Sequence, residues 1–217
     1  MSNAKKKQKP RPQPKPNRQI PISMIKNKMN IFNPSELLMN AREHPIYGCW
    51  VMEDWHESGI TPVVVAREQE PGYIMFGCYM IDLYCLGIKT AFVRTDFSLA
   101  KFQRMLPKLC SNAPEVCTVE LAHEIIYGGM EYAERYGFEP NPDFTALKTD
   151  MMLDAPDAHP RVNNVVFGND GQPFYISGPF DDNRKIKHIN DTLTRTAGEG
   201  NFKFIVNLGG MGADDDF

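Results

Sequence analysis

Apolar positions along the chain form one long run near its centre, with shorter patterned segments on either side. The run covers residues 73–93 and is rich in aromatic and β-branched side chains, which favour strands. The turn signal Pro71-Gly72 precedes it and two glycines interrupt it, as is typical of strands rather than of a long helix. Asp82 and Lys89 break the run, which argues against a membrane span. The run therefore predicts the central strand of a buried sheet.

Two segments before this run also have the pattern of strands. Residues 47–52 and 60–67 are short, rich in β-branched or aromatic side chains, and separated by a polar loop. A turn at 70–72 joins the second segment to the central strand. This order of strands and turns predicts an antiparallel sheet over residues 46–93.

Helical periodicity replaces strand periodicity after the sheet. Ser98 and Thr118 are placed to cap two helices, one over 99–109 and one that ends near residue 136. Gly128-Gly129 lies in the middle of the second helix at a cost to helicity, so we expect another backbone to approach there or the helix to bend. The sequence thus predicts two helices that pack on the sheet.

The last third of the chain has the pattern of a separate small unit. Residues 139–160 are rich in Pro and Asp and predict a linker or a loop packed over the core. Two short strands are then expected around the turn 168–171, followed by a helix over 181–196 and a final strand over 202–208. We therefore predict an α+β protein with a central antiparallel sheet packed by two helices and a C-terminal ββαβ unit. The expected boundaries are 1–30 for a disordered basic arm, 31–160 for the α+β core, 161–208 for the ββαβ unit and 209–217 for a flexible acidic tail.

Charge is distributed unevenly and points to a function for the arm. Residues 1–30 hold nine of the 24 Lys and Arg residues and none of the 27 Asp and Glu, so the arm carries +9 and the remainder −12. Alternating proline and polar residues leave the arm little to bury, so it is expected to be disordered. Its cations can displace counterions from a phosphate backbone, which favours binding to RNA or to a ribonucleoprotein such as the ribosome. A solubilising terminus explains the same charges.

The residues expected to contact nucleic acid lie in the arm and on the 181–196 helix. Asp181 and Asp182 occupy the first turn of that helix and repel anions from its tip, so its basic flank is the better contact. Pairing of that flank with the acidic core is an equal alternative. The candidates are Lys5, Lys6, Lys7, Lys9, Arg11, Lys15 and Arg18 in the arm, and Arg184, Lys185 and Lys187 in the helix.

A second interpretation is a small metal-dependent hydrolase or nuclease. Asp82 is a carboxylate on an apolar strand face, so we expect it either to act as a base or ligand or to pair with Lys89, Arg67 or a backbone amide. His123 and Glu124 supply an imidazole and a carboxylate on the long helix. The alternative catalytic set is therefore Asp82, His123 and Glu124. No zinc spacing, nucleophile elbow or phosphate loop accompanies them, so the preferred interpretation is a non-enzymatic protein without a cofactor.

The cysteines and the start of the chain suggest a location. The five cysteines are odd in number and none shows the two-residue gap of a zinc knuckle, which predicts free thiols in a reducing compartment. The Lys-rich start lacks the apolar segment of a secretory signal. We expect a cytoplasmic protein that does not bind membranes. A nuclear location is open because residues 5–9 form a basic import-like cluster.

The chain ends in three acidic residues and an aromatic one, Asp214, Asp215, Asp216 and Phe217. These four residues are similar to the acidic, Phe-terminated tip of bacterial single-stranded DNA-binding proteins. In that family the terminal Phe and its carboxylate dock in a basic pocket of partner enzymes, so the resemblance implies a protein partner for this tail. The strands predicted above do not form the five-stranded barrel of that family. A solubilising tail explains the same residues, and a protein-interaction module with an acidic surface is a third function class.

Overall fold

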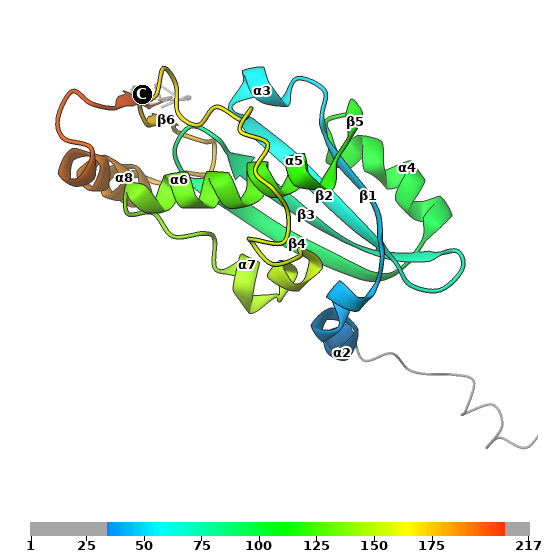
Figure 1. Ribbon diagram of the computed structural model, residues 1–217. Helices are drawn as coiled ribbons and strands as arrows, with labels where there is room; N and C mark the ends of the chain where they lie inside the picture. The colour runs from blue at the N-terminus through cyan, green and yellow to red at the C-terminus, as the bar shows by residue number, and fades with distance from the viewer. Residues whose placement is uncertain (1–33, 207–217) are drawn as a thin grey trace, which may run out of the picture. The chain divides into compact units, whose positions relative to one another are not determined.

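A computed structural model describes residues 34–206, and the expectations for the arm and for the acidic tail concern residues outside this range (Figure 1). The strands are β1 (Ile46–Met52), β2 (Ile60–Glu68), β3 (Tyr73–Asp82), β4 (Gly87–Ser98), β5 (Pro114–Cys117), β6 (Phe174–Ile176) and β7 (Lys203–Ile205). The α-helices are α2 (Pro34–Met39), α3 (Trp55–Ser58), α4 (Leu99–Leu109), α5 (Val119–His123), α6 (Gly129–Arg135), α7 (Asp143–Ala146) and α8 (Asn183–Thr196). Two 3-10 helices, η1 (Ala41–Glu43) and η3 (Thr149–Met152), and one π-helix, η2 (Glu124–Gly128), complete the elements. Among the described residues, no helix is both long and apolar enough to cross a bilayer.

Five antiparallel strands form the central sheet in the order β4-β3-β2-β1-β5. This arrangement confirms the predicted α+β fold with a central antiparallel sheet. Strand β2 lies in the middle, and seven consecutive residues of it are buried, from Thr61 to Arg67. Strand β5 adds a short fifth strand beside β1, in the stretch between the two predicted helices, where no strand was expected.

Both faces of the sheet are covered, because alternate residues of β2 face opposite sides. Val63 and Val65 belong to a core cluster with residues of α5 and η2, such as Ile125. Val64 and Ala66 belong to a second cluster with residues of α4. The two predicted helices therefore pack on opposite faces, which explains why β2 is an apolar run with no polar alternation.

The long helix predicted up to residue 136 is interrupted by one widened turn, the π-helix η2. Beyond it, Gly129 faces the start of β4 at very short range. A Cβ atom on Gly87 would lie 2.8 Å from the carbonyl oxygen of Gly129, and one on Gly129 would lie 2.9 Å from Cγ2 of Ile81. The expectation that another backbone approaches the paired glycines is confirmed. Turns of the π type are frequent at functional sites.

The C-terminal elements follow the predicted order, with one difference. Strands β6 and β7 pair in parallel and are connected by α8. The turn at 168–171 is present, but the strand pairing expected around it is reduced to a single bridge between Asn169 and Gln172. Phe167, just before the turn, instead packs on α6, where its ring stacks on Tyr132 with centroids 5.9 Å apart.

Candidate metal centre

Arg67 is the anchor of the site, and it is a charged residue buried at the C-terminal end of β2, the middle strand of the sheet. Its exposed fraction is 2%. The guanidinium Nε donates to the carbonyl oxygen of Met152 at 2.8 Å, and Nη1 donates to that of His44 at 2.7 Å. A buried guanidinium requires such partners, because an uncompensated charge inside a protein is costly. The chain after η3 is thereby held against β2.

Two tyrosines attach the same segment to the core. The hydroxyl of Tyr79 donates to the carbonyl oxygen of Thr149 at 2.7 Å, and that of Tyr127 donates to the carbonyl oxygen of Asp154 at 2.8 Å. Both tyrosines are buried. The segment, for which the sequence left a linker or a loop packed over the core as alternatives, is therefore fixed to the core along its backbone.

Asp154 connects the anchor to an imidazole. Its Oδ1 accepts a hydrogen bond from Nη2 of Arg67 at 2.6 Å, and its Oδ2 lies 2.8 Å from Nε2 of His159. Burial raises the pKa of the Asp154 carboxyl, but the hydrogen bonds from His159 and Arg67 outweigh it and hold that pKa below its ordinary value of 3.8. Asp154 is therefore a carboxylate at neutral pH, held by a cation on one oxygen.

His123 is the last residue of α5 and has an exposed fraction of 4%. Neither of its ring nitrogens has a hydrogen-bond partner among residues 34–206, although both are buried. Its ring meets that of His159 edge to face, with centroids 4.5 Å apart. Burial, together with the neighbouring His159, lowers the pKa of His123 from 6.5 to about 4. The imidazole is therefore neutral at pH 7 and has a free lone pair.

Three groups from two distant segments meet at this point. His123, Asp154 and His159 each offer one ligand atom, and in the described part of the chain these atoms all lie within 4.8 Å of one another. A tetrahedral zinc ion with ligands at 2.0–2.1 Å separates its ligand atoms by about 3.4 Å. The Asp154 and His159 atoms would have to move apart by about 0.6 Å to reach that separation. The remaining pairs of ligand atoms lie no more than 4.8 Å apart, so they would have to close by at most about 1.4 Å to hold such an ion.

A charged cleft of about 320 Å³ is lined by Glu124 and Arg161 but not by His123, although Arg161 lies close enough to act on the charge of His123. Glu124 is buried, and its Oε2 lies 3.6 Å from Nη1 of Arg161 without a hydrogen bond among the described residues. Arg161 also pairs with Glu131 at the rim. Asp154 and His159 are partly exposed, at 25% and 20% of their side chains, so water can reach the cluster.

Of the alternative set predicted from sequence, only His123 belongs to this cluster. Asp82 lies at the end of β3, where its Oδ1 accepts hydrogen bonds from the backbone N–H groups of Tyr84 and Cys85, both at 3.0 Å. It is thus paired with backbone amides at the strand end, one of the partners expected for it. Arg67, another partner expected for Asp82, pairs with Asp154 instead. Glu124 lines the neighbouring cleft.

Sequence reasoning missed Asp154 and His159. The two residues are five apart in a Pro- and Asp-rich segment and match no ligand spacing. The available signal was Arg67, a charge within an apolar strand that needs a buried partner. Nothing local to the sequence indicates that this partner is Asp154.

All five cysteines are free thiols, as predicted. Cys49 and Cys117 face each other across β1 and β5. Burial raises the pKa of both to about 12, so they are neutral thiols at pH 7. Neither belongs to the metal cluster, which contains only imidazole and carboxylate groups in the described part of the chain.

The candidate nucleic-acid contacts on α8 are exposed, but two of the three are already paired. Lys185 Nζ lies 2.6 Å from Oδ1 of Asp181, and Lys187 Nζ lies 2.7 Å from Oδ2 of Asp191. Arg184 is exposed. The other candidates, Lys5, Lys6, Lys7, Lys9, Arg11, Lys15 and Arg18, lie outside the described residues, as do Asp214, Asp215, Asp216 and Phe217.

Comparison of the chain with protein-family models, with curated proteins and with solved structures finds no match.

Proposed function

We propose that the protein is a metal-dependent hydrolase whose ion is held by His123, Asp154 and His159. The observation that carries this proposal is the buried imidazole of His123, which has no hydrogen-bond partner in the described part of the chain. Buried polar atoms are nearly always paired, and one without a partner calls for an ion or a water molecule. A metal ion between His123, Asp154 and His159 supplies that partner.

The ligand types favour a transition metal over magnesium or calcium. Imidazole nitrogen suits zinc, copper, iron and nickel, whereas magnesium and calcium prefer oxygen ligands. Three protein ligands leave a coordination position open for water, as in catalytic zinc sites. Arg67 serves as a positioning residue, because it fixes the second oxygen of the Asp154 carboxylate.

The bound ion would lower the pKa of its water and so supply a nucleophile at neutral pH. The remaining roles fall to residues of the adjoining cleft. Glu124 follows His123 directly and lines that cleft, so we assign it the proton from the attacking water. Water adds to the ester carbon or phosphorus, the bond to the leaving oxygen breaks, and the proton returns to that oxygen.

Metal binding is the first test. The full chain, stripped with EDTA, is titrated with Zn²⁺ in a calorimeter and with Co²⁺ in a visible spectrometer. We expect one ion per chain and the absorption bands of tetrahedral Co²⁺, both lost in His123→Ala and His159→Ala. His56→Ala is the control, because His56 is an exposed histidine outside the cluster. Absence of stoichiometric binding by the unaltered chain contradicts the proposal.

Activity is the second test. Bis(p-nitrophenyl) phosphate and p-nitrophenyl acetate report phosphodiester and carboxylester hydrolysis. Turnover that requires Zn²⁺ and is reduced at least about a hundredfold in Glu124→Gln, with metal binding retained, supports the assigned base. Metal binding without turnover of either compound would reduce the proposal to a metal-binding protein.

RNA binding remains a separate proposal for the arm. It is supported by the charge of +9 on residues 1–30 against −12 on the remainder. The ion pairs of Lys185 and Lys187 leave Arg184 as the most available cation of the three proposed on α8. Binding to RNA or a ribonucleoprotein is thus assigned mainly to the arm.

A further inference from the structure

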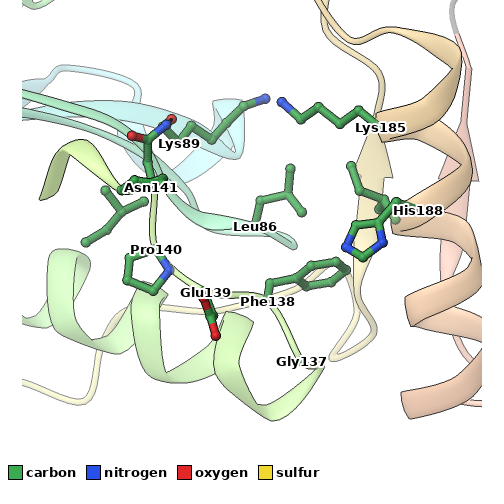
Figure 2. A pocket seen from close by; sticks show the side chains of 12 residues that line it. Leu86, Lys89, Gly137, Phe138, Glu139, Pro140, Asn141, Lys185 and His188 are labelled. Carbon is green, nitrogen blue, oxygen red and sulfur yellow. Dashed lines mark hydrogen bonds between the residues drawn. The ribbon is translucent and has the colours of Figure 1, made fainter. Parts of the chain in front are cut away.

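A second cleft, of about 510 Å³, lies on another part of the molecule. The start of β4, residues 137–142 and the first half of α8 line it (Figure 2). Its volume is in the range of sites for small molecules. None of the three metal-cluster residues lines it, so its function is independent of the proposed hydrolase.

Two lysines from different elements face each other across this cleft. Figure 2 shows the ammonium group of Lys89, on β4, and that of Lys185, on α8, pointing toward one another. Two ammonium groups that point toward one another can both contact an anion that lies between them. The ring of His188 lies on the same side as Lys185. The carboxylate of Glu139 points away from the two ammonium groups.

The two lysines differ in how they are compensated. Lys185 is paired with Asp181, whose Oδ2 in turn accepts hydrogen bonds from the hydroxyl of Tyr175 and the N–H of Gly178, at 2.8 and 2.7 Å. This network holds Lys185 in place. Lys89 is half-buried and forms no ion pair within residues 34–206, since Asp82 acts on it only from beyond 4.0 Å. A partly buried ammonium without a close anion is a ready partner for one.

The floor of the cleft is apolar. Figure 2 shows Leu86 at its centre, with Phe138 beside it, and Ile189 of α8 also lines the cleft. Phe138 and Ile189 also belong to the core cluster that joins the C-terminal elements to the sheet. The floor is therefore rigid, and it offers a surface for the uncharged part of a ligand.

We propose that this cleft binds a small organic anion, in which a phosphate or carboxylate group lies between Lys89 and Lys185 and a ring-sized apolar body rests on Leu86 and Phe138. The anion supplies the partner that Lys89 lacks, and it is a second partner for Lys185 beside Asp181. The apolar body accounts for a cleft much larger than a single phosphate ion requires.

The test uses phenylphosphonate, which carries an anion and a ring and cannot be hydrolysed as an ester. Its affinity for the full chain is measured by calorimetry in the presence of EDTA. We expect binding that weakens about tenfold in Lys89→Gln and in Lys185→Gln, because each loses one charge-assisted contact. Lys89→Arg, which keeps the charge, retains binding. Lys101→Gln is the matched control, since Lys101 is an exposed lysine on α4.

Three results would overturn the proposal. The first is no binding at millimolar phenylphosphonate, and the second is binding by both glutamine variants as tight as by the unaltered chain, with circular dichroism unchanged. The third is an affinity for inorganic phosphate equal to that for phenylphosphonate, which would show that the apolar floor does not contribute to binding. His123→Ala should bind phenylphosphonate normally. Loss of binding in that variant would place the ligand at the metal cluster and so also contradict a separate site.

Discussion

Arg67 and Asp154 lie 2.6 Å apart, between Nη2 and Oδ1, and join the C-terminal end of β2, the middle strand of the sheet, to a segment 87 residues further along the chain. The pair is asymmetric, because Arg67 is fully enclosed whereas Asp154 is partly exposed. Arg67 also donates to the backbone carbonyls of Met152 and His44. The guanidinium therefore joins three parts of the chain, which are β2, the residue that caps the end of η1 before β1, and the segment 152–154. Loss of Arg67 should therefore affect both the stability of the fold and the proposed metal site.

Arg67→Ala should therefore lower the free energy of unfolding by about 3–5 kcal/mol, as is typical when one partner of a buried pair is removed. Arg67→Lys should recover only part of that loss, since an ammonium cannot bond in three fixed directions. Urea denaturation measures both. Arg104→Ala is the control, because Arg104 is exposed on α4; an equal effect there would contradict the role of Arg67.

Asp82 gives a prediction for pH. Burial raises its pKa above 3.8, against the opposing effects of Lys89 and the backbone N–H groups of Tyr84 and Cys85. The folded protein therefore binds this proton more tightly than the unfolded chain does. The free energy of unfolding consequently falls as the pH rises from 3.8 through the raised pKa. Asp82→Asn keeps an acceptor and has no charge. Its stability relative to the unaltered chain should rise across that range.

A second variant at Asp82 separates the contribution of its hydrogen bonds from that of its charge. Asp82→Ala leaves two backbone donors without an acceptor, so relative to Asp82→Asn, which is also uncharged, it should cost about 1–3 kcal/mol at every pH. Urea midpoints from pH 4 to pH 7 give both comparisons. A difference between the unaltered chain and Asp82→Asn that does not change with pH would show that the carboxyl pKa is not raised.

The close approach of Gly87 and Gly129 predicts unequal costs for adding a methyl group. In Gly129→Ala the new atom meets the side chain of Ile81, which can shift, so we expect a loss of about 1–3 kcal/mol. In Gly87→Ala it meets the backbone carbonyl of Gly129, and Gly87 also has φ +62°. The left-handed conformation adds about 1–2 kcal/mol. Thermal unfolding should rank Gly87→Ala as the less stable variant, and the reverse order would contradict the packing described.

The arm gives a prediction for nucleic acid. A chain that starts at Asn30 should fold normally but lose salt-sensitive recovery of RNA or ribosomal particles from native lysate, because the phosphate-neutralising cations are removed. Pull-downs at low and high salt measure this against the full chain. Arg184→Gln in the full chain should have a smaller effect. Equal recovery by the full and shortened chains would exclude the arm as the binding element.

Local patterns in the sequence were sufficient to predict most of the fold. The caps at Ser98 and Thr118 are present as predicted, with their side chains accepting hydrogen bonds from the N–H groups of Lys101 and Leu121. Hydrophobic periodicity and helix capping depend on residues that are close in sequence, so both can be predicted from the sequence alone. The expected strand pairing before the turn at 168–171 was not formed in full, because Phe167 is used in packing on Tyr132.

The candidate site was less predictable for a physical reason. His123 is predicted from its helix, but its two partners come from the segment 149–159. The path of that segment is fixed by Arg67, Tyr79 and Tyr127, which are all distant from the segment in sequence. No spacing of histidines encodes such a meeting. The function of the arm and the location in the cell stay predictions.

The anchoring of the segment after α7 has a consequence for how the site tolerates change. Arg67, Tyr79 and Tyr127 all bond to backbone carbonyl oxygens, those of Met152, Thr149 and Asp154. Every residue type has such an oxygen, so these three bonds do not depend on the side chains at the accepting positions. They depend on the number of residues between them. Sequence drift at 149 and 152 can leave these bonds in place, whereas inserting or deleting one residue between 149 and 154 would shift Asp154 and His159 away from His123.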